Sequence, residues 1–232
     1  TISHDGVILR DTWDDIYKSV LHLNQTSTST KGAYVDASYN GTVTANTAGV
    51  KDTDNNFGTG GGLTASKAPT ATSITEGRIG VAADFDGTND FICIDTKDGD
   101  CTADQNPLYD SEISKRTISF WFSPDTLPEG AAGVDASMLY EEGGTVNGLN
   151  MYINGTKFFG GAWAGSYGWS GDWVTSSKSL EVDSWYFAAM VFDNPASGDK
   201  TLKIYLDGEL EGTINVETNI APNHTDDDGL GA

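Results

Sequence analysis

The sequence is short of basic residues and of long apolar runs, and each shortage excludes a class of partner. Only 13 lysines and arginines stand against 34 aspartates and glutamates, which gives a formal net charge of −21. Such a chain repels nucleic-acid phosphates and anionic lipids, so we expect no nucleic-acid partner. No apolar run approaches the roughly 18 residues that span a bilayer, so we expect no direct membrane insertion.

Cysteine and histidine are equally scarce. The two cysteines, Cys93 and Cys101, flank an Asp-rich loop and lack nearby histidine or cysteine partners, so a zinc site is not expected. Their short spacing suits a local disulfide in an oxidising compartment, and a pair of inert thiols is the alternative. The three histidines lie far apart and outside any nucleophile motif, so we expect ordinary surface or core residues there.

Helix-period patterns of convincing length are also missing. Instead, 28 glycines and an abundance of Thr, Ser and Asn predict many short strands joined by tight turns. The clearest central strand is Thr117-Ile-Ser-Phe-Trp-Phe122, in which Ile118, Phe120 and Phe122 would share one face. We expect an all-β fold made of two stacked antiparallel sheets, a jelly-roll sandwich.

Two hairpins support this interpretation. Residues 149–153 and 157–159 flank Asn154-Gly155, a strong hairpin signal. Residues 185–192 and 202–206 form the second predicted hairpin, whose second strand ends at Asp207-Gly208. Residues 1–15 indicate a linker or inter-domain join, and the remaining residues, 16–232, are predicted to form one domain.

Four segments, taken in order, resemble laminin-G-like domains of the concanavalin A-like lectin/glucanase (jelly-roll) superfamily. They are residues 20–24 with 36–41, 80–92, 117–124, and 185–193 with 202–208. Each pattern is weak alone, but four in the family's order make a joint signal. The resemblance implies the two-sheet sandwich already expected from the strand patterns.

The C-terminus departs from the family pattern. Such domains normally finish with a strand similar to "GxIDEVRI", whereas this sequence ends at Gly231-Ala232. We expect a truncated or remodelled final strand, and strand addition from another chain or segment is the alternative.

Catalysis is not expected. Glycoside hydrolases of this fold carry a Glu-x-Asp-x-x-Glu strand, and the nearest match, Glu181-Val-Asp-Ser-Trp-Tyr186, has Tyr in the acid position. Glu141 and Glu142 are adjacent, so a strand would point them to opposite faces and prevent acid/base cooperation. We therefore predict a protein that is not an enzyme, with an unrecognised glycosidase as the least favoured reading.

Calcium is the cofactor that the acidic loops favour, because hard cations take several oxygen ligands. One candidate site is the loop between the cysteines, with Asp95, Asp98, Asp100 and Asp104. The resemblance suggests a second site, formed by Asp86 and Asp90 together with Asp36. A solvated acidic turn is the alternative for each.

Ligand recognition has one candidate stretch, in which flat aromatic rings alternate with glycine and serine. Sugar rings stack on such faces, and the same side chains serve protein interfaces. The candidate ligand-binding residues are Trp163, Tyr167, Trp169, Asp172 and Trp173. The alternative is that two or three of these rings belong to the core.

These observations predict a secreted or cell-surface recognition and adhesion module, part of a larger surface protein. We expect it to be calcium-assisted and carbohydrate-binding, with a glycan or a surface protein as its partner. The alternative is a structural or assembly domain of a surface filament, which contacts other domains or copies of the parent protein.

Overall fold

The computed structural model describes residues 77–79, 82, 84–85, 92–93, 115–129, 136–143, 147–164, 172–216 and 229–230. The chain divides into two compact units, Thr1–Tyr109 with Asp227–Leu230 and Asp110–Asp226 with Gly231–Ala232. In the first unit, β1 (Ile92–Cys93) pairs antiparallel with β10 (Gly229–Leu230). The chain's last described residues thus form a two-residue strand.

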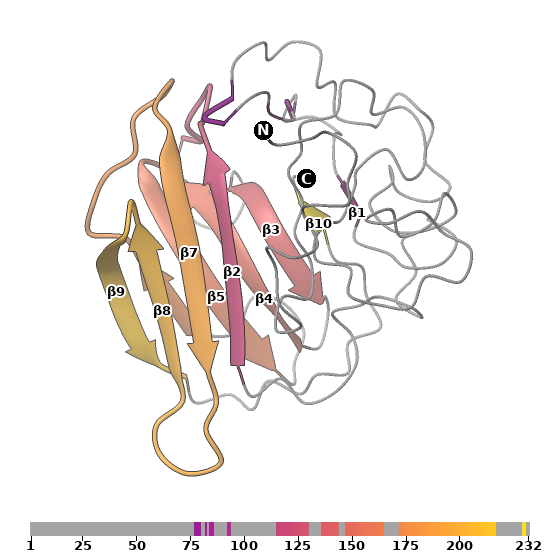
Figure 1. Cartoon of the computed structure of the whole chain (residues 1–232), viewed down its shortest axis with the longest axis vertical. Helices are drawn as coiled ribbons and strands as arrows, with labels where there is room; N and C mark the ends of the chain where they lie inside the picture. Colours follow the sequence, from indigo (N-terminus) through magenta and orange to yellow (C-terminus); the bar gives the residue numbers. More distant parts are fainter. Residues whose placement is uncertain are drawn as a thin grey trace, which may run out of the picture. The chain divides into compact units, whose positions relative to one another are not determined.

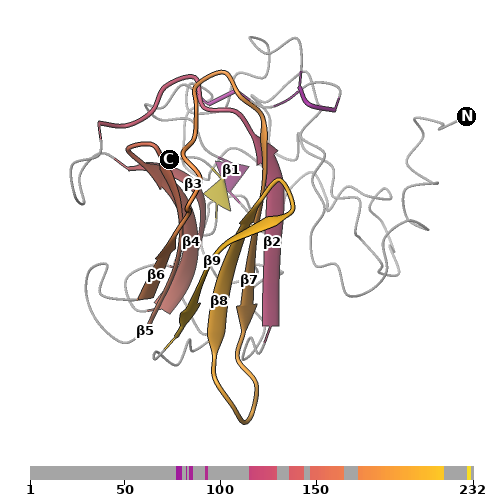
Figure 2. The same cartoon turned by 90° about the vertical axis from the view of Figure 1, so that its left-hand side faces the viewer.

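The described strands of the second unit lie in two antiparallel layers, which Figures 1 and 2 show from the front and from the side. The first sheet has the order β3-β4-β5-β6: Ser137–Gly143, Asn147–Asn154, Lys157–Ala164 and Asp172–Thr175. The second has the order β2-β7-β8-β9: Lys115–Phe122, Tyr186–Asp193, Thr201–Leu206 and Glu209–Asn215. No helix occurs among the described residues, so none there could span a membrane. The predicted all-β sandwich is confirmed.

Period-two burial explains why these segments are strands. Every second residue of β7 is buried, and β8 shows the same alternation. In β2, Thr117 and Ser119 are exposed while Phe122 is buried, as the sequence pattern predicts. The alternating side chains give each sheet one face directed at the other sheet.

Both predicted hairpins form, since β4 pairs with β5 and β7 pairs with β8, and the first turns at Gly155-Thr156, one residue later than predicted. Gly155, in the turn between β4 and β5, has a φ of 58°. Asp207 and Gly208 have φ values of 54° and 86°, which is the left-handed pair that a tight two-residue hairpin needs. The second of these turns begins an unpredicted strand, β9, whose residues are mostly exposed or half-buried. A strand with so little apolar alternation has a weak sequence signal.

The core lies between the sheets and is dense with aromatic rings. Phe122 of β2 stacks on Phe158 of β5, with ring centroids 6.0 Å apart. Gly160 lets the layers approach, because a Cβ there would lie 2.6 Å from Cγ2 of Ile204 on β8. Gly212 of β9 does the same opposite β6, where a Cβ would lie 2.5 Å from Cγ2 of Val174.

A buried ion pair also joins the two layers. Nη2 of Arg116 on β2 donates a 2.8 Å hydrogen bond to Oε1 of Glu142 on β3. The hydroxyl of Tyr140 donates to the other carboxylate oxygen at 2.9 Å. The Glu142 side chain is 1% exposed, so its charge depends on these two donors rather than on water.

Candidate ligand-binding face

The face of the first sheet that points away from the second sheet carries aromatic side chains. In β4 and β5 the alternating residues Leu149, Met151 and Phe158 point into the core, so their neighbours point outward. We call the outward set the aromatic face. It consists of Gly148, Asn150, Tyr152, Phe159, Gly161, Trp163, Trp173 and Thr175.

Two glycines on the aromatic face make room for two indole rings from neighbouring strands. Trp163 of β5 pairs with Gly148 of β4, and a Cβ on Gly148 would lie 2.5 Å from Cη2 of that ring. Trp173 of β6 pairs with Gly161 of β5, and a Cβ there would lie 2.5 Å from Nε1 and 2.8 Å from Cδ1. Each ring therefore lies over the bare backbone of the next strand.

A second aromatic pair stands beside these rings. Tyr152 and Phe159 are in register across β4 and β5, with centroids 4.8 Å apart and ring planes only 8° from parallel. Burial raises the pKa of Tyr152 to about 12. The phenol is therefore neutral at physiological pH, and its ring extends the flat surface.

Asn150 is the polar residue buried in this face. It is 1% exposed, and its Oδ1 has no hydrogen-bond partner among the residues that the structure describes. A Cβ on Gly161 would collide with this oxygen, so Oδ1 borders the same bare backbone as Nε1 of Trp173. Glu141 of β3 continues the row on the other side of Asn150.

Accessibility differs along the aromatic face. Trp163 is 7% exposed and is therefore a buried residue. This agrees with the alternative stated for the aromatic stretch, in which two or three of its rings belong to the core. Trp173, Phe159 and Glu141 are half-buried, and Thr175 is exposed. The part of the face that a ligand can reach therefore lies around Trp173, and Trp163 supports the surface from within.

The structure separates the ligand-binding residues predicted from the sequence. Trp163 and Trp173 share the aromatic face, whereas Asp172 precedes Trp173 in β6 and so points to the sheet's other side, in register with the buried Ala162. Tyr167 and Trp169 lie outside the described residues. Asn150 was missed in the sequence, since only the strand register places it beside Trp173.

The predicted metal ligands all lie outside the residues that the structure describes. They are Asp36, Asp86, Asp90, Asp95, Asp98, Asp100 and Asp104. Cys93 lies in β1, but Cys101 is outside the described residues, so their pairing stays a prediction. Within the described ranges no three His, Cys, Asp or Glu side chains gather to hold an ion.

Of the acidic residues considered for catalysis, two point to opposite faces of a strand and two are held by their backbone amides in the connection before β7. Glu142 points inward and Glu141 outward, as their adjacency predicted. Glu181 and Asp183 lie in the connection before β7, outside any strand. The Asp183 amide donates to the carbonyl of Pro124 at 2.9 Å, and the Glu181 amide donates to the Tyr186 hydroxyl at 2.8 Å.

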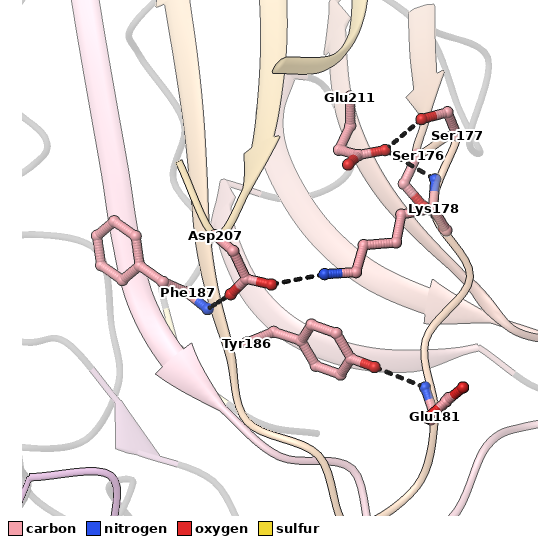
Figure 3. A network of polar contacts seen from close by, with 8 residues as sticks. All are labelled: Ser176, Ser177, Lys178, Glu181, Tyr186, Phe187, Asp207 and Glu211. Atoms are coloured by element: carbon pink, nitrogen blue, oxygen red, sulfur yellow. Dashed lines mark hydrogen bonds and ion pairs between the residues drawn. The ribbon is translucent and has the colours of Figure 1, made fainter. Parts of the chain in front are cut away.

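A polar network fixes the connection between β6 and β7 (Figure 3). Asp207 accepts from the Phe187 amide at 3.0 Å and from Nζ of Lys178 at 2.7 Å, and this hydrogen bond raises the pKa of Lys178. Burial pushes the pKa of Glu211 upward, but hydrogen bonds from Ser177 and from the Lys178 amide outweigh it, and the net pKa is lowered. The carboxylates of Asp207 and Glu211 are both hydrogen-bonded within the protein, so we regard this network as scaffold.

The comparisons with known proteins agree with this architecture. The binding domain of botulinum neurotoxin serotype D is similar over 96% of this chain and 44% of its own, with 16% identity and a TM-score of 0.54. The binding domain of Paraclostridial Mosquitocidal Protein 1 is similar over 70% of this chain and 38% of its own, with 13% identity and a TM-score of 0.51. The chain thus spans less than half the length of either, and at these identities the likeness concerns the fold.

Sequence comparison gives the family. A search of curated proteins finds no match. A laminin-G-type family model, described as Concanavalin A-like lectin/glucanases superfamily, matches residues 95–232, more than half of the chain. The chain belongs to the concanavalin A-like lectin/glucanases superfamily.

Proposed function

We propose that this chain is a non-catalytic glycan-recognition module of a secreted or cell-surface protein, and that the accessible part of its aromatic face binds the sugar. The observation that carries the proposal is Trp173, a half-buried indole lying over Gly161 beside the buried acceptor Asn150. A flat ring next to a fixed polar atom is the combination that sugar binding uses.

The shape of the face supports a sugar rather than a compact ligand. The half-buried Trp173 and Phe159 come from adjacent strands, and the buried Tyr152 continues the row of rings on the third strand. A pyranose presents one apolar face of C–H groups, which packs on an aromatic ring, and a rim of hydroxyls, which needs polar partners. Because position 161 is glycine, the Trp173 indole lies close to the β5 backbone.

The position of the carboxylates supports binding without hydrolysis. A glycosidase needs two carboxyl groups facing one sugar bond from the same side. Among the described strands, the adjacent Glu141 and Glu142 point to opposite faces, and Glu142 is held in an ion pair with Arg116. We therefore propose recognition as the whole activity.

Calcium assistance remains part of the proposal. The acidic residues that would hold the ion, such as Asp95 and Asp98, lie outside the described ranges, so the support comes from oxygen-ligand chemistry. Binding measured with calcium and with a chelator tests this part separately, and equal affinity in both conditions would contradict it.

A glycan array followed by calorimetry tests the sugar site. We expect Trp173→Ala to weaken binding of the best neutral glycan by roughly tenfold or more, because a buried aromatic contact is lost. The matched control is Trp121→Ala, since Trp121 is 40% exposed on the second sheet and packs on Phe187 there. Equal losses in both variants, or no glycan bound by the wild-type chain, would contradict the proposal.

A further inference from the structure

We propose that Asn150 is a positioning residue of this site: its Oδ1 accepts a hydrogen bond from the indole Nε1–H of Trp173 and so sets which edge of that ring faces the ligand. The inference rests on the proposed glycan-binding function and deepens it. The hydrogen bond itself lies within the protein, so it can be tested without a sugar.

One acceptor and one donor converge on the bare backbone of Gly161. Asn150, Gly161 and Trp173 form a single cross-strand row over β4, β5 and β6. Oδ1 of Asn150 and Nε1 of Trp173 both lie within 2.5 Å of the point that a Cβ on Gly161 would occupy, so they are at most twice that distance apart. The glycine in the middle of the row thus brings together side chains from two strands that are not adjacent.

The two atoms are chemically complementary, and water does not reach either of them. An amide oxygen only accepts hydrogen bonds, whereas an indole nitrogen only donates. Both atoms are closed to solvent, and Oδ1 has no hydrogen-bond partner among the described residues. A buried acceptor without a donor is destabilising, and the indole N–H is the donor that borders the same point.

Rotation of the Asn150 amide closes this contact. The contact lies outside hydrogen-bond geometry in the structure, and the direction of Oδ1 depends on the torsion about the Cβ–Cγ bond. That torsion is soft in asparagine, so the rotation costs little. Turning the amide over instead would place Nδ2, a donor, against the indole N–H, so the oxygen is the end that faces the ring.

A second indole on the same face shows what the amide changes. Trp163 lies over Gly148 in an equivalent row, whose third residue is Gly143 and has no side chain. There the ring atoms nearest to the glycine are Cζ2 and Cη2, which belong to the six-membered ring. In the row that contains Asn150 they are Nε1 and Cδ1, so the five-membered ring faces the backbone.

This orientation determines which part of Trp173 a sugar can meet. The residue is half-buried although its Nε1 is closed to solvent, so its accessible surface lies away from the N–H edge. A ring turned the other way would direct the N–H away from Oδ1 and leave that acceptor unsatisfied. Asn150 therefore keeps the N–H edge inside and leaves the six-membered ring as the stacking surface.

The indole signals in a proton–nitrogen correlation spectrum of the unliganded chain test the hydrogen bond. Trp173→Phe identifies the Trp173 signal by its loss. We expect that signal to lie downfield in the wild type and to move upfield in Asn150→Leu, which removes the acceptor at similar size. Asn150→Asp keeps an acceptor and should keep the signal downfield. Asn215→Leu, at an exposed position of β9, is the control and should leave the signal unchanged.

Unfolding temperatures test the same pair by a second route. Asn150→Leu removes the acceptor and Trp173→Phe removes the donor, so each single substitution leaves one buried partner unsatisfied. We expect both to lower the unfolding temperature, and the double variant to lose less than the sum of the two losses. Additive losses would overturn the hydrogen bond.

Calorimetry with maltotetraose, cellotetraose and lacto-N-tetraose tests the positioning role. For whichever probe the wild type binds, Asn150→Leu should weaken binding by roughly tenfold, because the ring loses its preference for one orientation. Asn150→Asp should retain most of the affinity. Adding Asn150→Leu to Trp173→Phe should cause no further loss, because the N–H is already absent.

The outcomes separate the two proposals. An unmoved Trp173 signal in Asn150→Leu overturns the hydrogen bond, and so does an upfield signal in Asn150→Asp, even if the leucine variant does not fold. A moved signal with unaltered affinity for a bound probe overturns the positioning role alone, as does a further loss in the double variant. A wild type that binds no sugar overturns the proposed function, while the spectrum still decides the hydrogen bond.

Discussion

The two faces of the sheet β3-β4-β5-β6 use glycine in opposite ways. On the inward face, Gly160 lets a separate sheet approach, so that Ile204 of β8 fills the space a Cβ would take. On the outward face, Gly148 and Gly161 admit rings from neighbouring strands of their own sheet. The inward glycine serves packing between layers, whereas the outward glycines shape a surface. Successive residues of one strand can thus separate stability from recognition.

Neighbouring phenylalanines provide the largest test of this difference. Phe158 points inward and is fully buried, so Phe158→Ala should lower the free energy of unfolding by about 4 kcal/mol. Phe159 is half-buried on the outward face, and Phe159→Ala should cost roughly half as much or less. Urea unfolding of the two variants measures both values. Equal losses of unfolding free energy would mean that Phe159 on the outward face contributes as much to stability as Phe158 in the core.

Neighbouring glutamates sharpen the comparison further. Glu142→Gln removes the charge that pairs with Arg116 inside the sandwich, and we expect a loss of about 3 kcal/mol in unfolding free energy. Glu141→Gln, on the outward face, should change stability by less than about 0.5 kcal/mol. The double variant Arg116→Met with Glu142→Leu should recover most of the loss, because no unpaired charge remains buried. A double variant as unstable as the single one would contradict this account.

A smaller effect is expected from pH, on the outward face. Because burial raises the pKa of Tyr152 to about 12 from its ordinary 10.0, the unfolded chain releases this proton first as pH rises. Ionisation of Tyr152 therefore leaves the free energy of unfolding unchanged below pH 10 and lowers it between about pH 10 and pH 12. Above about pH 12 it lowers the free energy no further. The total is about 2 kcal/mol by linkage.

Tyr152→Phe isolates this contribution from the other groups that titrate in alkali. Unfolding free energies of the variant and the wild type, measured from pH 9 to 12, should diverge as pH rises, with the variant losing less. Parallel curves would show that the Tyr152 hydroxyl is open to water, and that this part of the aromatic face is more accessible than its burial indicates.

The sequence was sufficient for the elements with clear alternation and turn chemistry. Residues 117–122 follow period-two burial, and the end of β8 at Asp207-Gly208 follows from left-handed turn residues, both of which are local signals. β9 escaped prediction because Glu209–Asn215 is an edge strand with little apolar alternation. Its identity depends on pairing with β8, which is a non-local property.

The candidate site was predictable in its rings but not in its arrangement. Trp163 and Trp173 were predicted to bind the ligand because they lie in an aromatic stretch, and the structure places them on the same face of the sheet. Asn150 gave no such signal, because an asparagine among strand residues is ordinary until the register places it beside Gly161. Asp172 was predicted to bind the ligand together with Trp173, but it lies on the other side of the sheet. Adjacent residues of a strand point to opposite sides.

The glycine beneath each indole has a consequence for how this surface can vary. Trp173 belongs to β6, but its ring fits only because residue 161 on the neighbouring strand β5 is glycine. This one contact therefore depends on residues in two segments of the sequence. Any larger residue at position 161 would require a smaller ring at position 173. Enlarging the residue at position 161 therefore takes paired substitutions, one on each strand.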